Sequence, residues 1–224
     1  MKNVIDKPAL NDNRNYNYSG FEEFERQDYN YVIALVEENS KVVDLGCGNG
    51  SLINLLKKNK NCVVKGVEIS DSGVQISKSR GLEVIKGRID EKLPFSDNEF
   101  DFSICHVTIQ MLMYPEILLR EMKRISKYQI ISFPNFAFYK NRFELLVKGK
   151  MPQKMLFGYK WYNTGHIHQL SITDFIELVD EIGGFKILKQ TFVETDFAIK
   201  NSLMKLFPNL FQQVSIFLLS KYDK

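Results

Sequence analysis

The stretch Val42–Ser51, VVDLGCGNGS, joins the apolar end of an expected strand to a turn that contains three glycines. A helical pattern over residues 52–58 follows at once. A strand, a glycine turn and a helix in this order bring a ligand against bare backbone at the start of the helix. The stretch therefore predicts a ligand site, and its polar residues should indicate which ligand it binds.

Strand and helix patterns alternate along the rest of the chain. Short β-branched runs predict strands, and apolar residues at helical spacing predict the helices between them. The expected strands are 41–45, 62–70, 82–87, 100–107 and 128–133, and the expected helices are 29–38, 51–58, 71–79 and 115–125. We expect Ser51 to cap the second helix, and Ser70 or Asp71 to cap the third. The alternation predicts a parallel α/β sheet with helices on both faces and a ligand site beyond the carboxyl ends of its strands.

The C-terminal part departs from this alternation. We expect a helix over 171–182, followed by strands over 185–194 and 213–221 with no helix between them. These two strands should pair antiparallel at one edge of the sheet, which would then contain seven strands.

The polar residues around the glycine turn favour one class of ligand. A dinucleotide fingerprint reads G-x-G-x-x-G, whereas Gly46, Gly48 and Gly50 place the third glycine one residue early. Asp44 precedes the turn, where a carboxylate would repel a pyrophosphate and suits the ammonium and sulfonium of S-adenosylmethionine. Glu68 ends the second expected strand, where an acid can accept hydrogen bonds from both ribose hydroxyls. The alternative is that both acids only cap neighbouring turns.

These motifs resemble a known family. The segments VVDLGCGNG, GVEIS and LPFSDNEFDFSIC resemble class I S-adenosylmethionine-dependent methyltransferases. The segment ISFPNFAFYKNRFELLVKGKMP, followed by WYNTGHIHQLSITDF, resembles the MetW family of methionine biosynthesis proteins. The similarity runs from about Tyr29 to the C-terminus.

The resemblance implies a fold, a cofactor and a partner. The fold is the Rossmann-like class I methyltransferase fold, in which helices cover both faces of a seven-stranded, mostly parallel sheet with an antiparallel edge pair. The implied cofactor is S-adenosylmethionine, or its product S-adenosylhomocysteine. The implied role is in methionine biosynthesis, where MetW is associated with homoserine O-acyltransferase.

The resemblance also assigns site residues by position. The matching positions are Asp44 for the methionine moiety, Gly46, Cys47 and Gly48 for the backbone along the cofactor, Glu68 for the ribose and Ile69 beside the adenine. The family's usual Gly-Asp after the third strand reads Gly87-Arg88 here. We therefore expect Asp90 or the backbone of Ile89 to bind the adenine amino group instead.

The chain's histidines are the candidates for acid–base catalysis. Methyl transfer to a good nucleophile needs mostly alignment, and a general base helps when the acceptor must lose a proton. His106 follows the fourth strand, where we expect a cofactor contact, with a base or a filler as alternatives. His166 and His168 would point to the same side of an extended chain. We expect no metal site because no third ligand lies nearby, and pairing with backbone carbonyls is the alternative role for these two.

Composition and motif order exclude other functions. A net charge of +3 is too small to indicate nucleic acid, and CHVTIQ stands where amino-directed nucleic-acid methyltransferases carry an Asn/Asp-Pro-Pro-aromatic motif. No apolar run approaches the ~20 residues that span a bilayer, and the polar N-terminus has no signal-peptide segment. The cysteines are widely spaced, which indicates reduced thiols in a cytoplasmic protein.

One domain is expected over residues 21–224, after a flexible segment over residues 1–20. Its unusual part is a helical, aromatic-rich insertion at about 134–170. Asn135 should cap an amphipathic helix there and Gly149 should end it. The apolar face of this helix comprises Phe136, Tyr139, Phe143, Leu146 and Val147. That face either packs on the sheet or serves as a lid or docking surface.

Two functions therefore follow from the sequence. The first is an S-adenosylmethionine-binding, MetW-like protein that activates or stabilises homoserine O-acyltransferase. The second is an active small-molecule methyltransferase unrelated to methionine synthesis. The cofactor motif permits both functions, and the family resemblance favours the first. A basic stretch over residues 120–160 fits an acidic protein partner or an ordinary solvated helix face.

Overall fold

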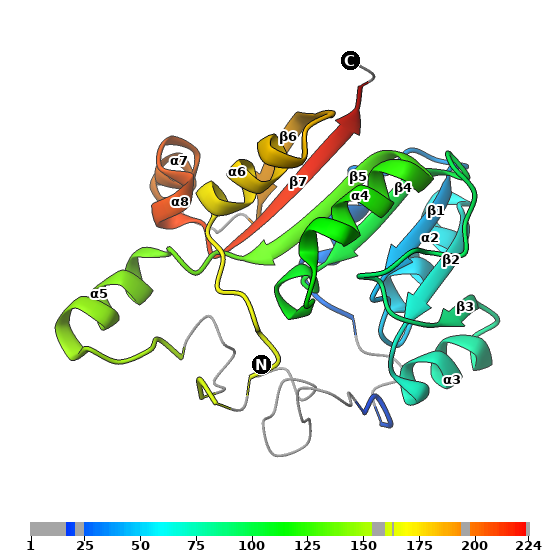
Figure 1. Ribbon diagram of the computed structural model, residues 1–224, viewed down its shortest axis with the longest axis horizontal. Coiled ribbons are helices and arrows are strands. Elements are labelled where there is room, and N and C mark those ends of the chain that lie inside the picture. Colours follow the sequence, from blue (N-terminus) through cyan, green and yellow to red (C-terminus); the bar gives the residue numbers. More distant parts are fainter. Residues whose placement is uncertain (1–16, 21–24, 154–159, 163, 194–197, 223–224) are drawn as a thin grey trace.

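One sheet organises the molecule. The computed structural model describes residues 17–20, 25–153, 160–162, 164–193 and 198–222. The strands form a seven-stranded sheet in the order β3-β2-β1-β4-β5-β7-β6 (Figure 1). The strands are β1 Lys41–Leu45, β2 Val63–Glu68, β3 Glu83–Lys86, β4 Phe100–His106, β5 Ser126–Pro134, β6 Phe185–Phe192 and β7 Val214–Lys221.

The strand order creates a topological switch point at β1. β1 pairs in parallel with β2 on one side and with β4 on the other, so the chain winds outward from β1 in both directions. Open α/β sheets bind ligands at such a switch point, beyond the carboxyl ends of the strands. β7 pairs antiparallel with both β5 and β6, which confirms the predicted antiparallel edge pair.

Helices cover both faces of the sheet. The helices are α1 Tyr29–Ile33, α2 Ser51–Lys60, α3 Asp71–Ser79, α4 Pro115–Ile125, α5 Tyr139–Lys148, α6 Ile172–Ile182, α7 Ala198–Leu206 and α8 Pro208–Phe211, with a 3-10 turn, η2, at Ile109–Met111. Successive side chains of a strand point to opposite faces, so Val42 and Val43 of β1 enter different hydrophobic clusters. The Val42 cluster includes residues of α1, α2 and α3, and the Val43 cluster includes residues of α4 and α6.

The helix starts differ in part from the prediction. Gly50, with a φ of 74°, is the N-cap of α2, so Ser51 is its first helical residue and the predicted Ser51 cap is wrong. The glycine turn needs a left-handed residue at this point, and only glycine takes that conformation without strain. Ser70 caps α3 by accepting a hydrogen bond from the Gly73 N–H, as predicted. α1 ends at Ile33, five residues earlier than expected, because the next residues form tighter i to i+3 turns.

The connection between β6 and β7 contains helices that the sequence did not indicate. α7 and α8 lie between these strands, so the prediction of a helix-free connection is wrong. Pro208 starts α8 and divides the apolar pattern into two short pieces, which leaves each too short for a clear helical period. Gln212 joins the pieces by donating a hydrogen bond to the Met204 carbonyl.

Helix α5 stands apart from the sheet. Figure 1 shows it projecting beside α7 and α8, and most of its apolar side chains are exposed. Of the two alternatives left open by the sequence, the structure therefore excludes packing of this apolar face on the sheet. Phe138 rather than Asn135 is the N-cap. The Asn135 Oδ1 accepts instead from the Ala137 N–H, ahead of the helix, and its amide donates to carbonyls of the α8 region. Gly149 ends the helix in a left-handed conformation, as predicted.

Candidate functional site

The turn after β1 presents backbone to the carboxyl edge of the sheet. Gly46, Gly48 and Gly50 have φ angles of 87°, 56° and 74°. Residues that carry a Cβ atom rarely adopt such positive φ angles, so these positions favour glycine. A Cβ added to Gly46 would lie 2.8 Å from the Thr108 side chain. Gly46 therefore also permits the close approach of the segment that follows β4. The predicted glycine site is thus a tightly packed backbone turn.

Cys47 contributes only its backbone to this turn. Its thiol faces Gly66 of β2, where an added Cβ would lie 2.6 Å from Cys47 Sγ. Burial, followed by the charges of Asp44 and Glu68, raises the pKa of the Cys47 thiol well above its usual range. The thiol is therefore neutral and buried, and it has no reactive character.

Asp44 is the most unusual residue of the site. It lies one residue before the end of β1 with 2% of its surface exposed, and its Oδ1 has no hydrogen-bond partner among the described residues. Burial and the nearby charge of Glu68 raise the pKa of Asp44 to about 8. Buried polar atoms are nearly always paired, since an unpaired one costs about 1–3 kcal/mol. A ligand that brings a positive donor to this carboxylate would satisfy it.

Glu68 ends β2, adjacent to Asp44, and fixes the glycine turn. Its Oε2 accepts a hydrogen bond of 2.8 Å from the Gly48 N–H, and its Oε1 accepts one of 2.8 Å from the Ser70 N–H. Burial raises the pKa of Glu68, while these backbone bonds act in the opposite direction. Glu68 therefore joins the glycine turn to the start of α3, and each oxygen keeps a lone pair for further donors.

The residues after β3 behave differently from the prediction for the adenine. Asp90 is buried, and its Oδ2 accepts bonds from Arg88 at 2.7 Å and from the Met113 N–H at 3.0 Å. This oxygen is therefore already used to connect the loops that follow β3 and η2. Ile89 is 5% exposed, whereas Ile69, after β2, is half exposed and available to an aromatic ring.

His106 ends β4 and is held from both sides. Its Nδ1 lies 2.7 Å from Ser132 Oγ of β5, and its Nε2 lies 3.2 Å from Asp28 Oδ1, outside the direction of a hydrogen bond. Ser132 Oγ accepts from the Val107 N–H. The Asp28 carboxylate beside Nε2 favours the tautomer with its proton on Nε2, in which Nδ1 accepts from the Ser132 O–H. Burial lowers the pKa of His106, against the effect of Asp28. The imidazole is therefore neutral, with its Nε2–H facing Asp28.

Asp28 and its neighbour Arg26 were not identified from the sequence. Arg26 donates two hydrogen bonds of 2.9 Å to the Asp28 carboxylate. Burial alone would raise the pKa of Asp28, but its interactions with His106 and Arg26 hold it well below the usual range. A neutral His106 supplies no charge, so the bidentate Arg26 pair is the main reason that Asp28 stays ionised. Polar residues before α1 gave no motif that could have indicated this pairing.

The N-terminal segment also reaches the glycine turn. The Tyr18 ring lies where a Cβ on Gly48 would meet it at 3.1 Å, and the Tyr18 N–H donates to Ser72 Oγ at 2.9 Å. Tyr18 falls in the part of the sequence, residues 1–20, that was expected to be flexible; residues 1–16 lie outside the described residues. No motif or spacing in the sequence predicts this contact of Tyr18.

The backbone directly after β4 is strained. Val107 has a φ of 53°, a left-handed conformation that is rare for a β-branched residue. Its carbonyl accepts from Gln110 Nε2, while Gln110 Oε1 is buried without a partner among the described residues. Strain of this kind collects at ligand sites, where surrounding contacts maintain it. The segment that crosses the switch point is therefore held in a fixed shape by His106, Thr108 and Gln110.

The other two histidines do not form a pair. His166 is 7% exposed and burial lowers its pKa to about 4, whereas His168 is exposed. The expectation that they point to the same side is therefore wrong. The backbone N–H groups of Ile167 and His168 both donate to the Gln110 carbonyl, so this segment lies against η2.

The structure thus brings together the residues predicted around β1, β2 and β4. A model of the family described as methionine biosynthesis protein MetW matches residues 26–219. The chain belongs to the MetW family. A bifunctional methionine biosynthesis protein MetXA/MetW from Rhodopirellula baltica is 30% identical over 165 residues, which are 69% of this chain and 26% of that protein.

Two further similarities extend the comparison. An uncharacterised protein from Methanocaldococcus jannaschii is 31% identical over 132 residues, which cover 56% of this chain and 57% of that protein. This MetW chain therefore spans about a quarter of the first relative and just over half of the second. The solved S-adenosylmethionine-dependent methyltransferase from Thermotoga maritima covers 87% of this chain and 88% of its own, with a TM-score of 0.59 and 21% identity. Strand order and this likeness show the Rossmann-like class I methyltransferase fold.

The described part of the chain contains no cluster of three or more histidine, cysteine or acidic side chains able to hold a metal ion. Within the same residues, every helix is too short or too polar to cross a membrane.

Proposed function

We propose that this MetW chain binds S-adenosylmethionine or S-adenosylhomocysteine at the carboxyl ends of β1 and β2 and acts in methionine biosynthesis as a partner of homoserine O-acyltransferase. Asp44 carries this proposal: it is a buried acid with an unpaired oxygen and a pKa of about 8. A cationic ligand is the partner that such an acid needs. A pyrophosphate would bring negative charge beside Asp44 and Glu68 and could not stabilise the ionised form of either acid.

The residues present fit the cofactor. Asp44 would receive its ammonium, the backbone from Gly46 to Gly48 would lie along it, and the open lone pairs of Glu68 would accept from the ribose. Ile69, half exposed after β2, would lie beside the adenine. Asp90 Oδ2 is already bonded, which leaves the backbone of Ile89 as the better candidate for the adenine amino group. When bound, S-adenosylmethionine supplies an electrophilic methyl group.

The family and one of its relatives support the proposed partner. The relative from Rhodopirellula baltica combines MetXA and MetW in one bifunctional methionine biosynthesis protein. A MetW portion joined to a second component by one chain is at high effective concentration beside it. In our proposal, the present chain meets the corresponding acyltransferase.

The alternative is an active small-molecule methyltransferase unrelated to methionine synthesis. The arrangement of His106 disfavours a methyltransferase in which His106 is the general base. Its Nδ1 accepts from Ser132, and its Nε2–H faces Asp28. A residue held in this way positions the N-terminal segment and has no lone pair to offer an acceptor's proton. His166 and His168 remain candidates for a base, and of the two only His168 is exposed.

Calorimetry with three ligands tests the cofactor. We expect S-adenosylmethionine and S-adenosylhomocysteine to bind and NAD to give no heat. Glu68→Ala should weaken binding by roughly 1.5–3 kcal/mol, as expected for hydrogen bonds to a charged group. Because Glu68 also holds the glycine turn, Glu68→Gln and thermal unfolding of both variants separate lost contacts from a loosened turn. Binding of NAD, or of no adenosyl ligand, would refute the proposal.

A second assay tests the partner. The homoserine O-acyltransferase of the same organism is assayed alone and with this protein, each with and without S-adenosylmethionine. We expect the acyltransferase to be more active or longer-lived with the MetW chain present. Unchanged rate and lifetime under all four conditions would leave cofactor binding standing and remove the proposed partner.

A further inference from the structure

Helix α5 carries exposed apolar side chains that have no role in the fold. Phe143, Leu146 and Val147 are 66%, 84% and 61% exposed. We call these three residues the α5 ridge. Asn141 is the one buried residue of the helix, so α5 does not use its apolar side chains for packing on the described body. Large exposed apolar groups gathered in one place mark interaction sites.

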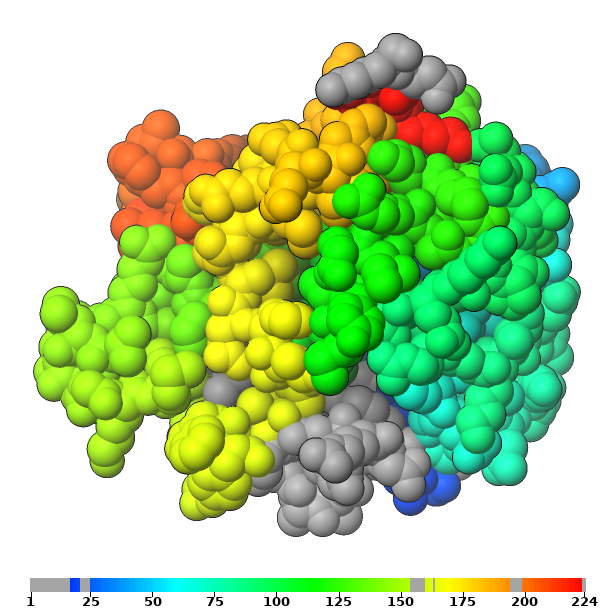
Figure 2. Space-filling view, viewed as in Figure 1, coloured from blue at the N-terminus to red at the C-terminus, as the bar shows by residue number. Residues whose placement is uncertain are grey.

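The α5 ridge continues onto the neighbouring helix through aromatic contacts. Tyr139, at the start of α5, lies with its ring centroid 5.7 Å from that of Phe211 in α8. Phe211 in turn lies 6.4 Å from Phe207, which is 51% exposed. In the space-filling view of Figure 2, α5 forms a lobe next to α7 and α8. Figure 1 shows α5 on the opposite side of the molecule from β1 and β2. The surface is therefore separate from the cofactor site.

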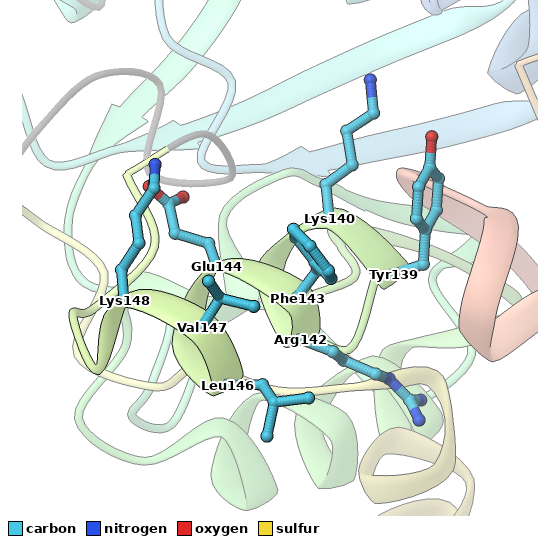
Figure 3. A pocket seen from close by; sticks show the side chains of 8 residues that line it. All are labelled: Tyr139, Lys140, Arg142, Phe143, Glu144, Leu146, Val147 and Lys148. Atoms are coloured by element: carbon cyan, nitrogen blue, oxygen red, sulfur yellow. The ribbon is translucent and has the colours of Figure 1, made fainter.

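Basic side chains flank the ridge. Lys140, Arg142, Lys148 and Lys150 lie on or just after α5, against one acid, Glu144, so these five residues carry four positive charges and one negative charge, a net +3. Figure 3 shows Phe143 and Val147 on one side of the helix, with Lys140 and Lys148 extending beyond them. Glu144 is already paired with Lys148 at 3.1 Å, which leaves the remaining positive charges uncompensated by it. An apolar centre with a positive rim fits a partner that has an apolar patch with an acidic rim.

We propose that the α5 ridge and its basic rim form the docking surface for an acidic face of the homoserine O-acyltransferase. This inference rests on the function proposed above. A second copy of this chain fits less well, because a two-fold contact would bring the same positive rim against itself. An anionic membrane surface would also attract the basic rim, but α5 is only ten residues long and its apolar stripe lacks tryptophan.

Two pairs of substitutions separate the charged and apolar parts of the surface. Lys140→Glu with Lys150→Glu reverses the rim and leaves the Lys148–Glu144 pair intact. Phe143→Ser with Leu146→Ser removes the exposed apolar groups. The matched controls are Lys58→Glu with Lys78→Glu, on exposed positions of α2 and α3, and Leu188→Ser on β6, where the side chain is 44% exposed.

Binding of the purified acyltransferase is measured by calorimetry at 50 and 300 mM salt. We expect the charge reversal to weaken binding at least tenfold at low salt and less at high salt, because salt screens exposed charges. The apolar variant should weaken binding at least tenfold at both salt concentrations, and the controls should change it less than twofold. All variants should bind S-adenosylmethionine and unfold at the temperature of the wild type.

Each of four other outcomes would contradict the proposed docking surface, and each would point to a different explanation. Full binding by both α5 variants places the interface elsewhere and leaves the proposed function intact. A wild type that does not bind the acyltransferase removes the partner, and this surface proposal with it. Sedimentation of the wild type as a dimer that the α5 variants dissociate would identify a second copy as the occupant. Salt-sensitive binding to vesicles with anionic lipid, without binding to the acyltransferase, would identify a membrane.

Discussion

Asp44 combines three properties at a single residue: burial, a neighbouring acid and an oxygen without a partner. Each is unfavourable for an ionised carboxylate, and together they raise its pKa to about 8. Perturbed groups of this kind concentrate at functional sites, where the cost to stability serves binding. The sequence predicted Asp44 and Glu68 because acids before and after a glycine turn form a recognisable pattern. It did not predict that Glu68 would already hold two backbone N–H groups, since these bonds depend on the folded turn.

Asp44→Asn should remove the part of the pH dependence of stability that Asp44 causes. The folded pKa lies above the 3.8 of an unperturbed aspartate, so the folded state keeps a proton that the unfolded state releases. This contribution is complete below about pH 4 and is lost as the pH rises through about 8. We therefore expect the free energy of unfolding of Asp44→Asn to exceed that of the wild type by about 1–3 kcal/mol at pH 9, with a smaller difference at pH 5.

Urea unfolding of the ligand-free protein from pH 5 to pH 9 measures this difference. Glu91→Gln, an exposed acid outside the site, serves as the control and should track the wild type at every pH. A difference between Asp44→Asn and the wild type that stays constant with pH would mean that Asp44 is ionised throughout.

At the scale of elements, the glycine turn and the strands and helices next to it were predictable from the sequence. The connection between β6 and β7 and the environment of α5 were not. β-branched runs and capping residues were enough to place β1 to β5 and α2 to α4 within a few residues. The connection between β6 and β7 was misread, because Pro208 splits it into helices too short to show a period. α5 was correctly expected as an amphipathic helix, but the pattern cannot say whether an apolar face meets the sheet or the solvent.

Two alanine substitutions test why the turn needs glycine. Gly46 and Gly149 both have positive φ angles, of 87° and 60°, but only Gly46 has neighbours within 4 Å of an added Cβ. Gly46→Ala should lower the free energy of unfolding by about 2–4 kcal/mol, from backbone strain plus the contact with Thr108. Gly149→Ala should cost about 1–2 kcal/mol, from backbone strain alone.

Thermal and chemical unfolding of both variants provide the comparison. Adding Thr108→Ala to Gly46→Ala should restore part of the loss, since it removes the atoms that the new Cβ would meet. Equal costs at Gly46 and Gly149 would show that close packing adds nothing to the requirement for glycine.

At the scale of the whole molecule, the N-terminal segment is part of the site. Tyr18 lies against Gly48, and Asp28 faces His106, which is bonded to Ser132 on β5. These residues are far apart in the sequence, and no spacing rule relates them, so they could not be predicted from a single chain. The sequence correctly placed His106 beside the switch point and missed that its partners come from the N-terminus and from β5.

Asp28→Asn should destabilise the protein because it breaks the bidentate pair with Arg26. We expect a loss of about 1.5–3 kcal/mol, typical of hydrogen bonds between charged groups with little exposure. Because the folded pKa of Asp28 lies below the 3.8 of an unperturbed aspartate, its contribution to stability is complete above pH 3.8 and is lost as the pH falls through the folded value.

Chemical unfolding at pH 7 and at pH 3 checks both statements. Asp97→Asn is the matched control: Asp97 pairs with Arg124 at 2.8 Å, but its side chain is 73% exposed, so its loss should cost less than about 0.5 kcal/mol. Equal effects of the two substitutions at pH 7 would show that the Asp28 contact is as weak as a surface ion pair.

Proton release on cofactor binding is the most direct test of the claim that Asp44 binds a cationic ligand. At pH 7 the free protein holds Asp44 mostly protonated, since its pKa is about 8, and a cation requires the carboxylate. Calorimetric titration with S-adenosylmethionine in two buffers of different ionisation enthalpy should therefore show release of close to one proton in the wild type. Asp44→Asn should bind at least tenfold more weakly and release none. Binding of S-adenosylmethionine by the wild type without proton release, or equally tight binding by Asp44→Asn, would contradict this account.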